Sequence, residues 1–357
     1  MLRVGLIGVF EGSARDFSGL PAQRGAQLAV EELNSAGGVN IGGVRHRVVL
    51  TEKQIAPRTD AAAAAARSLI NIDSVDVIID PQFSNLAVAA SAVAEAASVP
   101  LIAPMASGPA VTEGRQFTTR LAFVDPLQGE VLARFAYDSL KVRRAAALFN
   151  VASSYGRDIV RLFSSTFSTV GGTFTDSVSF NADAPGELPA ALRQVLKGRT
   201  DAILLPNFVS KDSMQPRQLR AMGYTGRFLG SDGWDATAIK DRSAIVGVII
   251  VGNFDKRDAR PALTAFSALW RQHYPNDPLR ATAAATYDAV RIVADAAMAA
   301  GTTDGPSLAG AIRAPRIVEG ALATYRFNGS GDPTRGAVLL EVRADSAILR
   351  ATAAVNR

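Results

Sequence analysis

Residues 75–104, "VDVIIDPQFSNLAVAASAVAEAASVPLIAP", join two short apolar runs through a longer alanine-rich segment. The first run, 75–80, carries aliphatic side chains on both of its alternating faces, which is typical of a strand covered on both sides. The second run, 100–104, has a similar character, and the segment between them predicts a helix over 85–97. A strand, a crossover helix and a second strand form the repeating unit of a parallel sheet. This stretch therefore predicts an α/β fold.

The same alternation of strand and helix extends along most of the chain in both directions. We predict further strands at 2–10, 47–53, 118–123, 145–150, 201–207, 227–231, 247–253, 322–327 and 336–343. We predict further helices at 22–35, 59–71, 127–140, 155–170, 187–197, 211–222, 260–273 and 281–300. A chain of 357 residues exceeds the size at which one core usually keeps growing, so two domains are expected. Ligand sites in such sheets lie at the carboxyl ends of the strands.

The composition excludes several classes of protein. The 48% hydrophobic content is ample for buried cores, and no stretch approaches the ~20 uninterrupted apolar residues of a spanning helix. The net charge is +5, but the basic residues are scattered in short groups such as 141–144, without interleaved aromatics, so we expect no nucleic acid partner. Cysteine is absent, which excludes disulfides and thiolate metal sites.

The location of the protein is left open by its first residues. The first predicted strand begins at Leu2, which leaves no room for a signal peptide. If a leader has been removed, we expect a periplasmic or other extracytoplasmic protein. A cytoplasmic location would fit a regulatory protein.

Motifs for catalysis are missing from the chain. The loop "GVFEGSARDFSGLP" at 8–21 and the loop "GSGDPTRG" at 329–336 both lack the G-x-G-x-x-G spacing, and no P-loop lysine or G-x-S-x-G elbow occurs. The two histidines, His46 and His273, lie among polar residues and are expected at the surface. The acidic residues show no metal-ligand spacing. We therefore predict no enzyme, no cofactor and no metal site.

Five segments in order give the chain a resemblance to a known family. They are "GGV" after the first helix, 75–113, "SSYGRD" (153–158), "LRAMGYTGRFLGSDGWD" (219–235) and "ATYDAVRIVADA" (285–296). Together they resemble the leucine/isoleucine/valine-binding group of type I periplasmic solute-binding proteins, the branched-chain amino acid ABC transporter family. The resemblance covers nearly the whole chain.

The resemblance implies a fold of two α/β lobes, each with a mainly parallel sheet flanked by helices. A hinge of three strands joins the lobes, with crossings near 120–124, 250–254 and 327–332. Lobe one would comprise 1–121 and 253–328, and lobe two 122–252 and 329–357. The ligand would be held in a cleft between the lobes and trapped when they close.

Part of the ligand site implied by the family falls in lobe one. Phe17 in "ARDFSG" takes the place of the aromatic residue that covers the ligand. The turn "PQFSNLAV" corresponds to the helix start that binds the ligand's carboxylate, and Ser84 is expected to be its N-cap. Here the chain departs from the family, because the family's serine aligns with Phe83 and Ser84 is its neighbour. A shift of one residue would restore the contact through Ser84.

The rest of the implied site comes from both lobes. In "APMASGP" the family's carbonyl maps to Met105 or Ala106, and its hydroxyl maps to Ser107. Lobe two would contribute Tyr155 and Phe208, the latter standing where relatives often have tyrosine.

Asp232 in "GSDGWD" matches the acidic residue that receives the ligand's ammonium group. Trp234, nearby, would be a pocket wall or a surface cover. Serine hydroxyls, helix amides and one carboxylate suit a zwitterion, because charge-assisted hydrogen bonds are strong. Aromatic walls suit a large aliphatic or aromatic side chain.

These residues predict the solute-binding component of an ABC importer that captures a hydrophobic α-amino acid by hinge closure. We expect it to act as a monomer that delivers the ligand to a membrane permease. Two alternatives remain: a binder of an aromatic or aliphatic carboxylate without an amino group, and a ligand-sensing regulatory protein on the same fold.

Overall fold

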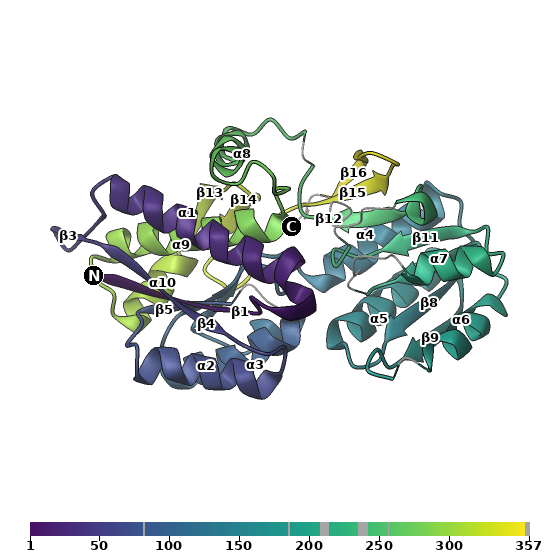
Figure 1. Ribbon diagram of the computed structural model, residues 1–357, viewed down its shortest axis with the longest axis horizontal. Helices are drawn as coiled ribbons and strands as arrows, with labels where there is room; N and C mark the ends of the chain where they lie inside the picture. The colour runs from purple at the N-terminus through teal and green to yellow at the C-terminus, as the bar shows by residue number, and fades with distance from the viewer. Residues whose placement is uncertain (81–82, 185, 208–213, 235–241, 256, 354–357) are drawn as a thin grey trace. The chain divides into compact units, whose positions relative to one another are not determined.

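The computed structural model describes residues 1–80, 83–184, 186–207, 214–234, 242–255 and 257–353 (Figure 1). The chain forms two compact units. Unit 1 comprises Met1–Ala122 and Arg257–Arg335, and unit 2 comprises Phe123–Lys256 and Gly336–Arg357. The chain therefore passes from one unit to the other three times, and each unit is built from two separate segments of sequence.

Unit 1 is built on a five-stranded sheet in which every neighbouring pair is parallel. Its order is β4 (Val48–Gln54), β1 (Leu2–Gly8), β5 (Val77–Ile79), β6 (Leu101–Ala103) and β7 (Thr118–Arg120). Its helices are α1 (Leu20–Ser35), α2 (Thr59–Asn71), α3 (Ser84–Ala96), α8 (Pro261–His273), α9 (Ala281–Ala300) and α10 (Gly305–Arg313). Two small antiparallel hairpins complete the unit: β2 (Val39–Ile41) with β3 (Val44–His46), and β13 (Arg316–Glu319) with β14 (Thr324–Phe327).

Helices cover both faces of this sheet (Figure 1). Helices α2 and α3 bury alanine and leucine side chains against aliphatic strand residues such as Ile7 and Ile78. Helices α1 and α9 lie on the other face and contact each other closely. A Cβ at Gly25 of α1 would fall 2.1 Å from the carbonyl oxygen of Ala283, so only glycine permits this approach. Strands buried on both faces explain the continuous apolar runs in the sequence.

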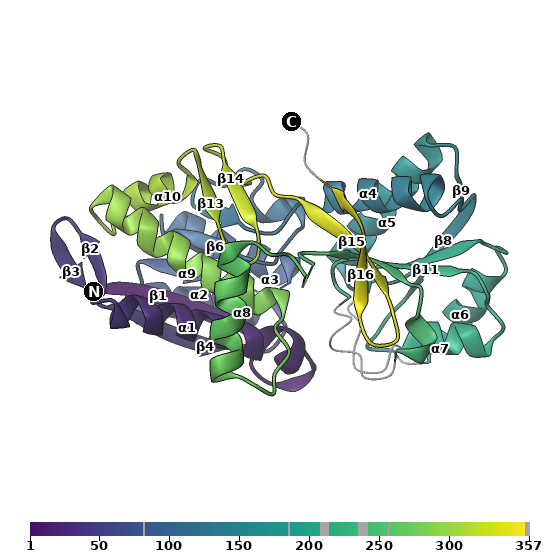
Figure 2. The ribbon, with the colours of Figure 1, turned by 90° about the horizontal axis from the view of Figure 1, so that it is seen from above.

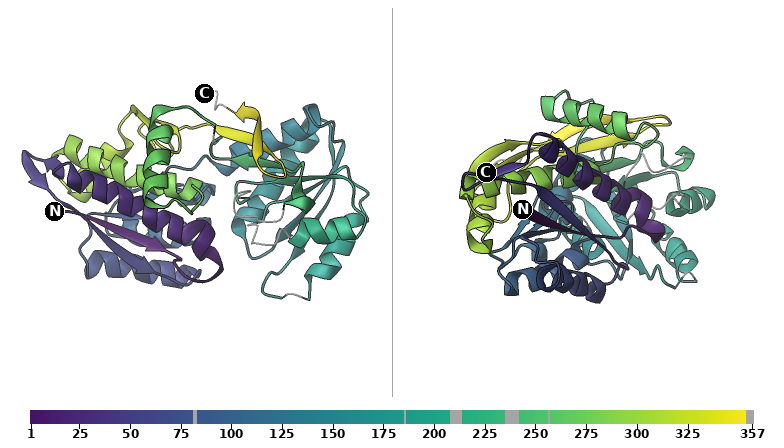
Figure 3. Two further views of the ribbon diagram at one scale, coloured as in Figure 1. Left: turned by 45° about the horizontal axis from the view of Figure 1, so that its top comes forward. Right: turned by 60° about the vertical axis from the view of Figure 1, so that its left-hand side comes forward.

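Unit 2 contains a seven-stranded mixed sheet. Its order is β16 (Ala347–Ala353), β15 (Ala337–Val342), β12 (Ile249–Gly252), β11 (Arg227–Gly230), β10 (Ala202–Leu205), β8 (Arg144–Asn150) and β9 (Thr173–Phe180). The strands from β12 to β9 pair in parallel, and the hairpin of β15 and β16 adds antiparallel to β12 (Figure 3). Helices α4 (Asp125–Asp138) and α5 (Ser154–Thr169) cover one face, and α6 (Leu188–Leu196) and α7 (Met214–Ala221) cover the other (Figure 2).

The predicted α/β class with mainly parallel sheets flanked by helices is confirmed. Some elements were not predicted: β2, β3, β9, β13, β16 and α10. Strand β9 was missed because it is an edge strand with mostly polar, half-exposed side chains and therefore lacks an apolar run. Helix α10 was missed because its glycines, proline and serine read as a loop, although Asp304 caps it by accepting from the amide of Ser307.

Candidate functional site

The predicted residues of unit 1 lie after β1, β5 and β6, neighbouring strands of one parallel sheet. Their carboxyl ends lie at the same edge of the sheet, so the loops that follow them are neighbours. Phe17 and Phe83 come from two of these loops, and their ring centroids lie 6.0 Å apart with the planes tilted by 58°. The structure thus brings together two aromatic residues separated by more than sixty positions in the sequence.

Phe17 lies in a single π-helical turn, Arg15–Gly19, that continues directly into α1. Such turns occur often at functional sites because they aim a side chain out of the regular helix. The turn packs against the end of β1, where a Cβ at Gly19 would fall 1.9 Å from the carbonyl oxygen of Val9. Phe17 itself is partly exposed.

The prediction that Ser84 caps α3 is wrong. The N-cap is Phe83, whose backbone is extended (φ −78°, ψ 151°), and Ser84 is the first helical residue. The Ser84 side chain is buried and its hydroxyl accepts a hydrogen bond from the amide of Gly108, 3.1 Å away. The serine therefore connects the start of α3 to the loop after β6. The first amides of α3 still form an end that favours a negative charge.

The loop after β6 carries the other predicted residues of unit 1. Ala106 and Ser107 are buried, with 1% and 3% of their surfaces exposed, whereas Met105 is partly exposed. The carbonyl oxygen of Ser107 accepts from the guanidinium of Arg120 at 2.7 Å. Its hydroxyl makes no hydrogen bond within the part of the chain that the structure describes. Serine hydroxyls and amides at one edge suit a carboxylate.

In unit 2, two predicted residues meet directly. Tyr155, on the first turn of α5, donates its hydroxyl to Oδ1 of Asp232 at 2.5 Å, and Asp232 follows β11. The amide of Gly233 donates to the same tyrosine oxygen at 3.3 Å. Burial, followed by the nearby carboxylates of Asp232 and Asp125, raises the pKa of Tyr155 well above its usual value. The hydroxyl therefore keeps its proton and acts as a fixed donor to the carboxylate.

Two residues of this cluster were not predicted from the sequence. Asp125, the first residue of α4, is completely buried, and its Oδ1 accepts from Nε2 of Gln128 at 2.8 Å. Gln128 in turn accepts from the amide of Asp232 at 3.2 Å through its Oε1. The only local signal is an acidic residue before a proline at a helix start, "VDPLQ", which is also an ordinary helix beginning.

The last two predicted residues of unit 2 have different outcomes. Phe208 lies outside the described residues. Trp234 is buried in the unit's core, 4% exposed, and its Nε1 donates to the carbonyl oxygen of Leu205 at 2.8 Å. It is therefore a core residue rather than a surface cover.

The two units offer opposite chemistry. Unit 1 contains hydroxyls and helix amides, while unit 2 contains the partly exposed carboxylate of Asp232 beside a neutral tyrosine and the buried carboxylate of Asp125. Within the described ranges, no cluster of three histidine, cysteine or acidic side chains could hold a metal ion. In the same ranges, no helix has the length and apolar composition needed to cross a bilayer.

Comparison with known proteins decides the family. The sequence model of the periplasmic binding protein family matches residues 1–347. The chain belongs to the periplasmic binding protein family. A Leu/Ile/Val-binding protein homologue of Brucella melitensis is 24% identical over 337 residues, which cover 93% of this chain and 88% of the relative.

Solved structures of this family agree with the fold. A leucine binding protein from Thermotoga maritima superposes with a TM-score of 0.89 at 27% identity, covering 99% of each chain. A solute binding protein from Rhodopseudomonas palustris, in complex with benzoate, gives a TM-score of 0.85 at 19% identity, covering 99% of this chain and 96% of the other.

Membership of the periplasmic binding protein family confirms two predictions. The family consists of solute-binding proteins rather than enzymes, so the predicted binding role is confirmed and catalysis is not its function. The family also implies a location outside the cytoplasm, and the regulatory alternative finds no support.

Proposed function

We propose that this protein is the solute-binding component of an ABC importer and captures a hydrophobic α-amino acid. One observation carries the proposal: Tyr155 and Gln128 orient Asp232 beside a second, buried carboxylate in unit 2. A carboxylate held in a fixed orientation accepts strong, charge-assisted hydrogen bonds, and a ligand's ammonium group is the kind of donor that makes them.

Unit 1 would bind the carboxylate and the side chain of the ligand. Ser84 and Ser107, with the first amides of α3, would receive the carboxylate, and Phe17, Phe83 and Met105 would form apolar walls. Capture would involve a hinge motion, which the ligand's contacts would bias toward the closed form. The names of the relatives, Leu/Ile/Val-binding and leucine binding, favour a branched aliphatic side chain.

The importer role adds a membrane permease as partner. A monomer with the ligand enclosed would present a loaded surface to that permease, while the ligand-free form would not.

A second candidate ligand is an aromatic carboxylate without an amino group. The pair of Phe17 and Phe83 favours it, and the structurally similar protein from Rhodopseudomonas palustris is in complex with benzoate. The carboxylates of Asp125 and Asp232 oppose it, because two acidic side chains in one cluster disfavour a second anion nearby.

A ligand panel tests the proposal by thermal shift and calorimetry. The panel contains leucine, isoleucine, valine and phenylalanine, with benzoate and 4-methylpentanoate as acids that lack the amino group. A ligand at about 100 times its dissociation constant stabilises the folded protein by about 2.7 kcal/mol. We expect stabilisation by at least one of the amino acids and none by the two acids. Stabilisation by the acids alone would favour the second candidate and reject the first.

A further inference from the structure

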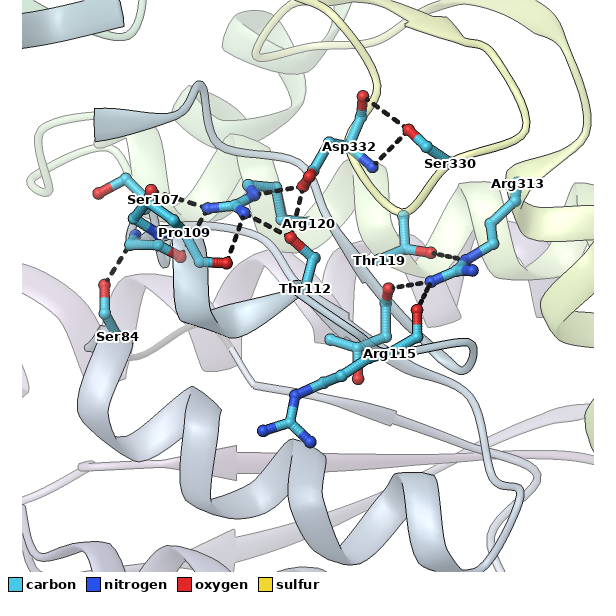
Figure 4. A network of polar contacts seen from close by, with 12 residues as sticks. Ser84, Ser107, Pro109, Thr112, Arg115, Thr119, Arg120, Arg313, Ser330 and Asp332 are labelled. Atoms are coloured by element: carbon cyan, nitrogen blue, oxygen red, sulfur yellow. Dashed lines mark hydrogen bonds and ion pairs between the residues drawn. The ribbon is translucent and has the colours of Figure 1, made fainter. Parts of the chain in front are cut away.

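Arg120, the last residue of β7, is a buried cation, with 1% of its side chain exposed. Its Nε donates to Oδ1 of Asp332 at 2.6 Å, and its Nη2 donates to the hydroxyl of Thr112 (Figure 4). Thr112 donates in turn to the same oxygen of Asp332 at 2.7 Å. A buried guanidinium is stable only when its charge and its donors are satisfied, and this triad satisfies one side of it.

The other donors of Arg120 all point to one short segment of backbone. Nη1 donates to the carbonyl oxygens of Ser107 and Gly108 at 2.7 and 2.8 Å, and Nη2 reaches that of Pro109 at 3.4 Å (Figure 4). Three consecutive carbonyls therefore face one cation. This segment belongs to the loop after β6, which carries the proposed ligand contacts.

The orientation of the Ser107 carbonyl also determines where the amide of Gly108 points. The carbonyl of Ser107 and the amide of Gly108 belong to one planar peptide unit and point in opposite directions. Since the carbonyl faces Arg120, the amide faces away from it and donates to the hydroxyl oxygen of Ser84 at 3.1 Å. The peptide is thus held from both ends.

This contact has a consequence for the hydroxyl of Ser84. A hydroxyl has one proton to donate, and the bond from Gly108 occupies an acceptor position only. No other hydrogen bond of this hydroxyl exists among the residues that the structure describes. Within those described ranges its donor position is unused, which suits a contact with a ligand's carboxylate.

We propose that Arg120 is a positioning residue for carboxylate recognition, acting through the peptide of Ser107 and Gly108 on the hydroxyl of Ser84. The inference rests on the proposed function, which assigns Ser84 and Ser107 to the ligand's carboxylate. Arg120 does not touch the ligand. It holds the loop so that the hydroxyls meet the carboxylate without reorganisation, which is the advantage of a preorganised site.

Arg313 in the same unit offers a matched control. It also binds backbone, donating to the carbonyl oxygens of Arg115 and Thr118 at 2.9 and 2.6 Å, and to the hydroxyl of Thr119 (Figure 4). None of these acceptors lies in the segment 107–109 that Arg120 binds. Loss of Arg313 therefore removes a comparable set of hydrogen bonds without releasing the peptide that holds Ser84.

The experiment compares Arg120→Met, Arg120→Lys and Arg313→Met in the full chain with two probes. L-leucine carries both an ammonium and a carboxylate, and L-leucinamide carries the ammonium with a neutral amide instead. Calorimetry gives the dissociation constants, and denaturant unfolding gives the stability of each variant. A structural defect alone weakens both probes equally, whereas a positioning role weakens leucine selectively.

We expect Arg120→Met to weaken leucine by about 30-fold and leucinamide by less than about threefold, since only the carboxylate loses a charge-assisted contact. Arg120→Lys should restore part of the loss, and Arg313→Met should weaken neither probe by more than about threefold at a similar loss of stability. If Arg120→Met does not fold, Asp332→Asn should also weaken leucine more than leucinamide, by a smaller factor.

Two outcomes would overturn the inference. One is an equal weakening of both probes, and the other is an effect of Arg120→Met no larger than that of Arg313→Met. If the unaltered chain binds no amino acid, the proposed function has failed, and this inference falls with it.

Discussion

Each unit contains a tyrosine hydroxyl that donates to an aspartate, and the two pairs differ in their surroundings. In unit 1, Tyr325 donates to Asp288 at 2.9 Å, and the amides of Ala321 and Leu322 donate to the same carboxylate at 2.7 and 2.9 Å. Asp288, on α9, is 3% exposed and holds the turn between β13 and β14. Its partners are all supplied by its own unit, so the pair is structural.

In unit 2, the pair of Tyr155 and Asp232 lies at the carboxyl end of the sheet, and Asp232 is partly exposed. The difference between the pairs is access to the carboxylate. A carboxylate enclosed by its own fold stabilises that fold, whereas one that remains reachable can receive a ligand. The following experiments test this contrast.

The largest expected effect is a pH dependence of stability that comes from Asp288. Burial raises the pKa of Asp288 to about 6. The hydrogen bonds from the two amides and from Tyr325, and the charge of Arg260, lower the pKa but do not cancel the effect of burial. Between about pH 4 and 6 the folded chain keeps this proton while the unfolded chain loses it, so the contribution of Asp288 to stability falls as the pH rises.

Asp288→Asn cannot ionise. We therefore compare the unfolding free energy of the unaltered chain with that of this variant. The difference should fall by up to about 3 kcal/mol, in disfavour of the unaltered chain, as the pH rises from 4 to 6, and it should stay constant above pH 6. Denaturant unfolding at several pH values measures the difference, and the exposed Glu113→Gln serves as control. A difference that does not change with pH contradicts this account of Asp288.

The second effect concerns binding through Asp232. Asp232→Asn keeps the shape of the side chain and removes its charge, so leucine affinity should fall by about 100-fold while stability changes by less than about 1 kcal/mol. Calorimetry with leucine measures the loss, and Asp138→Asn, an exposed residue at the end of α4, provides a control in the same unit. Unchanged affinity would show that Asp232 does not receive the ammonium group.

The smallest effect comes from the two tyrosines. Tyr155→Phe removes one donor to Asp232 and should weaken leucine by about fivefold with little change in stability. Tyr325→Phe should lower the unfolding free energy by about 1 kcal/mol and leave leucine affinity unchanged. The same two assays separate these outcomes. The contrast between the units fails if both variants change the same quantity.

Much of the fold could be predicted because its signals are local. Helices α2 and α9 begin and end at the predicted residues, since their alanine-rich sequences are uninterrupted by glycine or proline. The buried strands β5 and β10 were recognised by continuous aliphatic runs. Ser84 failed as a cap because the helix start depends on the backbone angles of Phe83, which the residue types do not determine.

The site was harder to predict because its contacts join distant positions. The family resemblance placed Tyr155 and Asp232 separately in the site, but nothing in the sequence predicted their contact, since 77 positions separate them. Gln128 reaches Asp232 across 104 positions, and Arg120 reaches Asp332 across 212. Only the fold brings such residues together, and no local pattern distinguishes Asp125 from an ordinary first residue of a helix.

The three passages of the chain also have a consequence for biosynthesis. Unit 2 begins at Phe123, yet its sheet lacks β15 and β16 until the segment from Gly336 has been made. Unit 1 is likewise incomplete until α9 and α10 have been synthesised, although its first strands are synthesised at the beginning of translation. Neither unit can complete its core while the ribosome is still producing the middle of the chain. Native pairing must await sequence-distant partners, which favours slow folding and leaves apolar strands exposed to chaperones for longer.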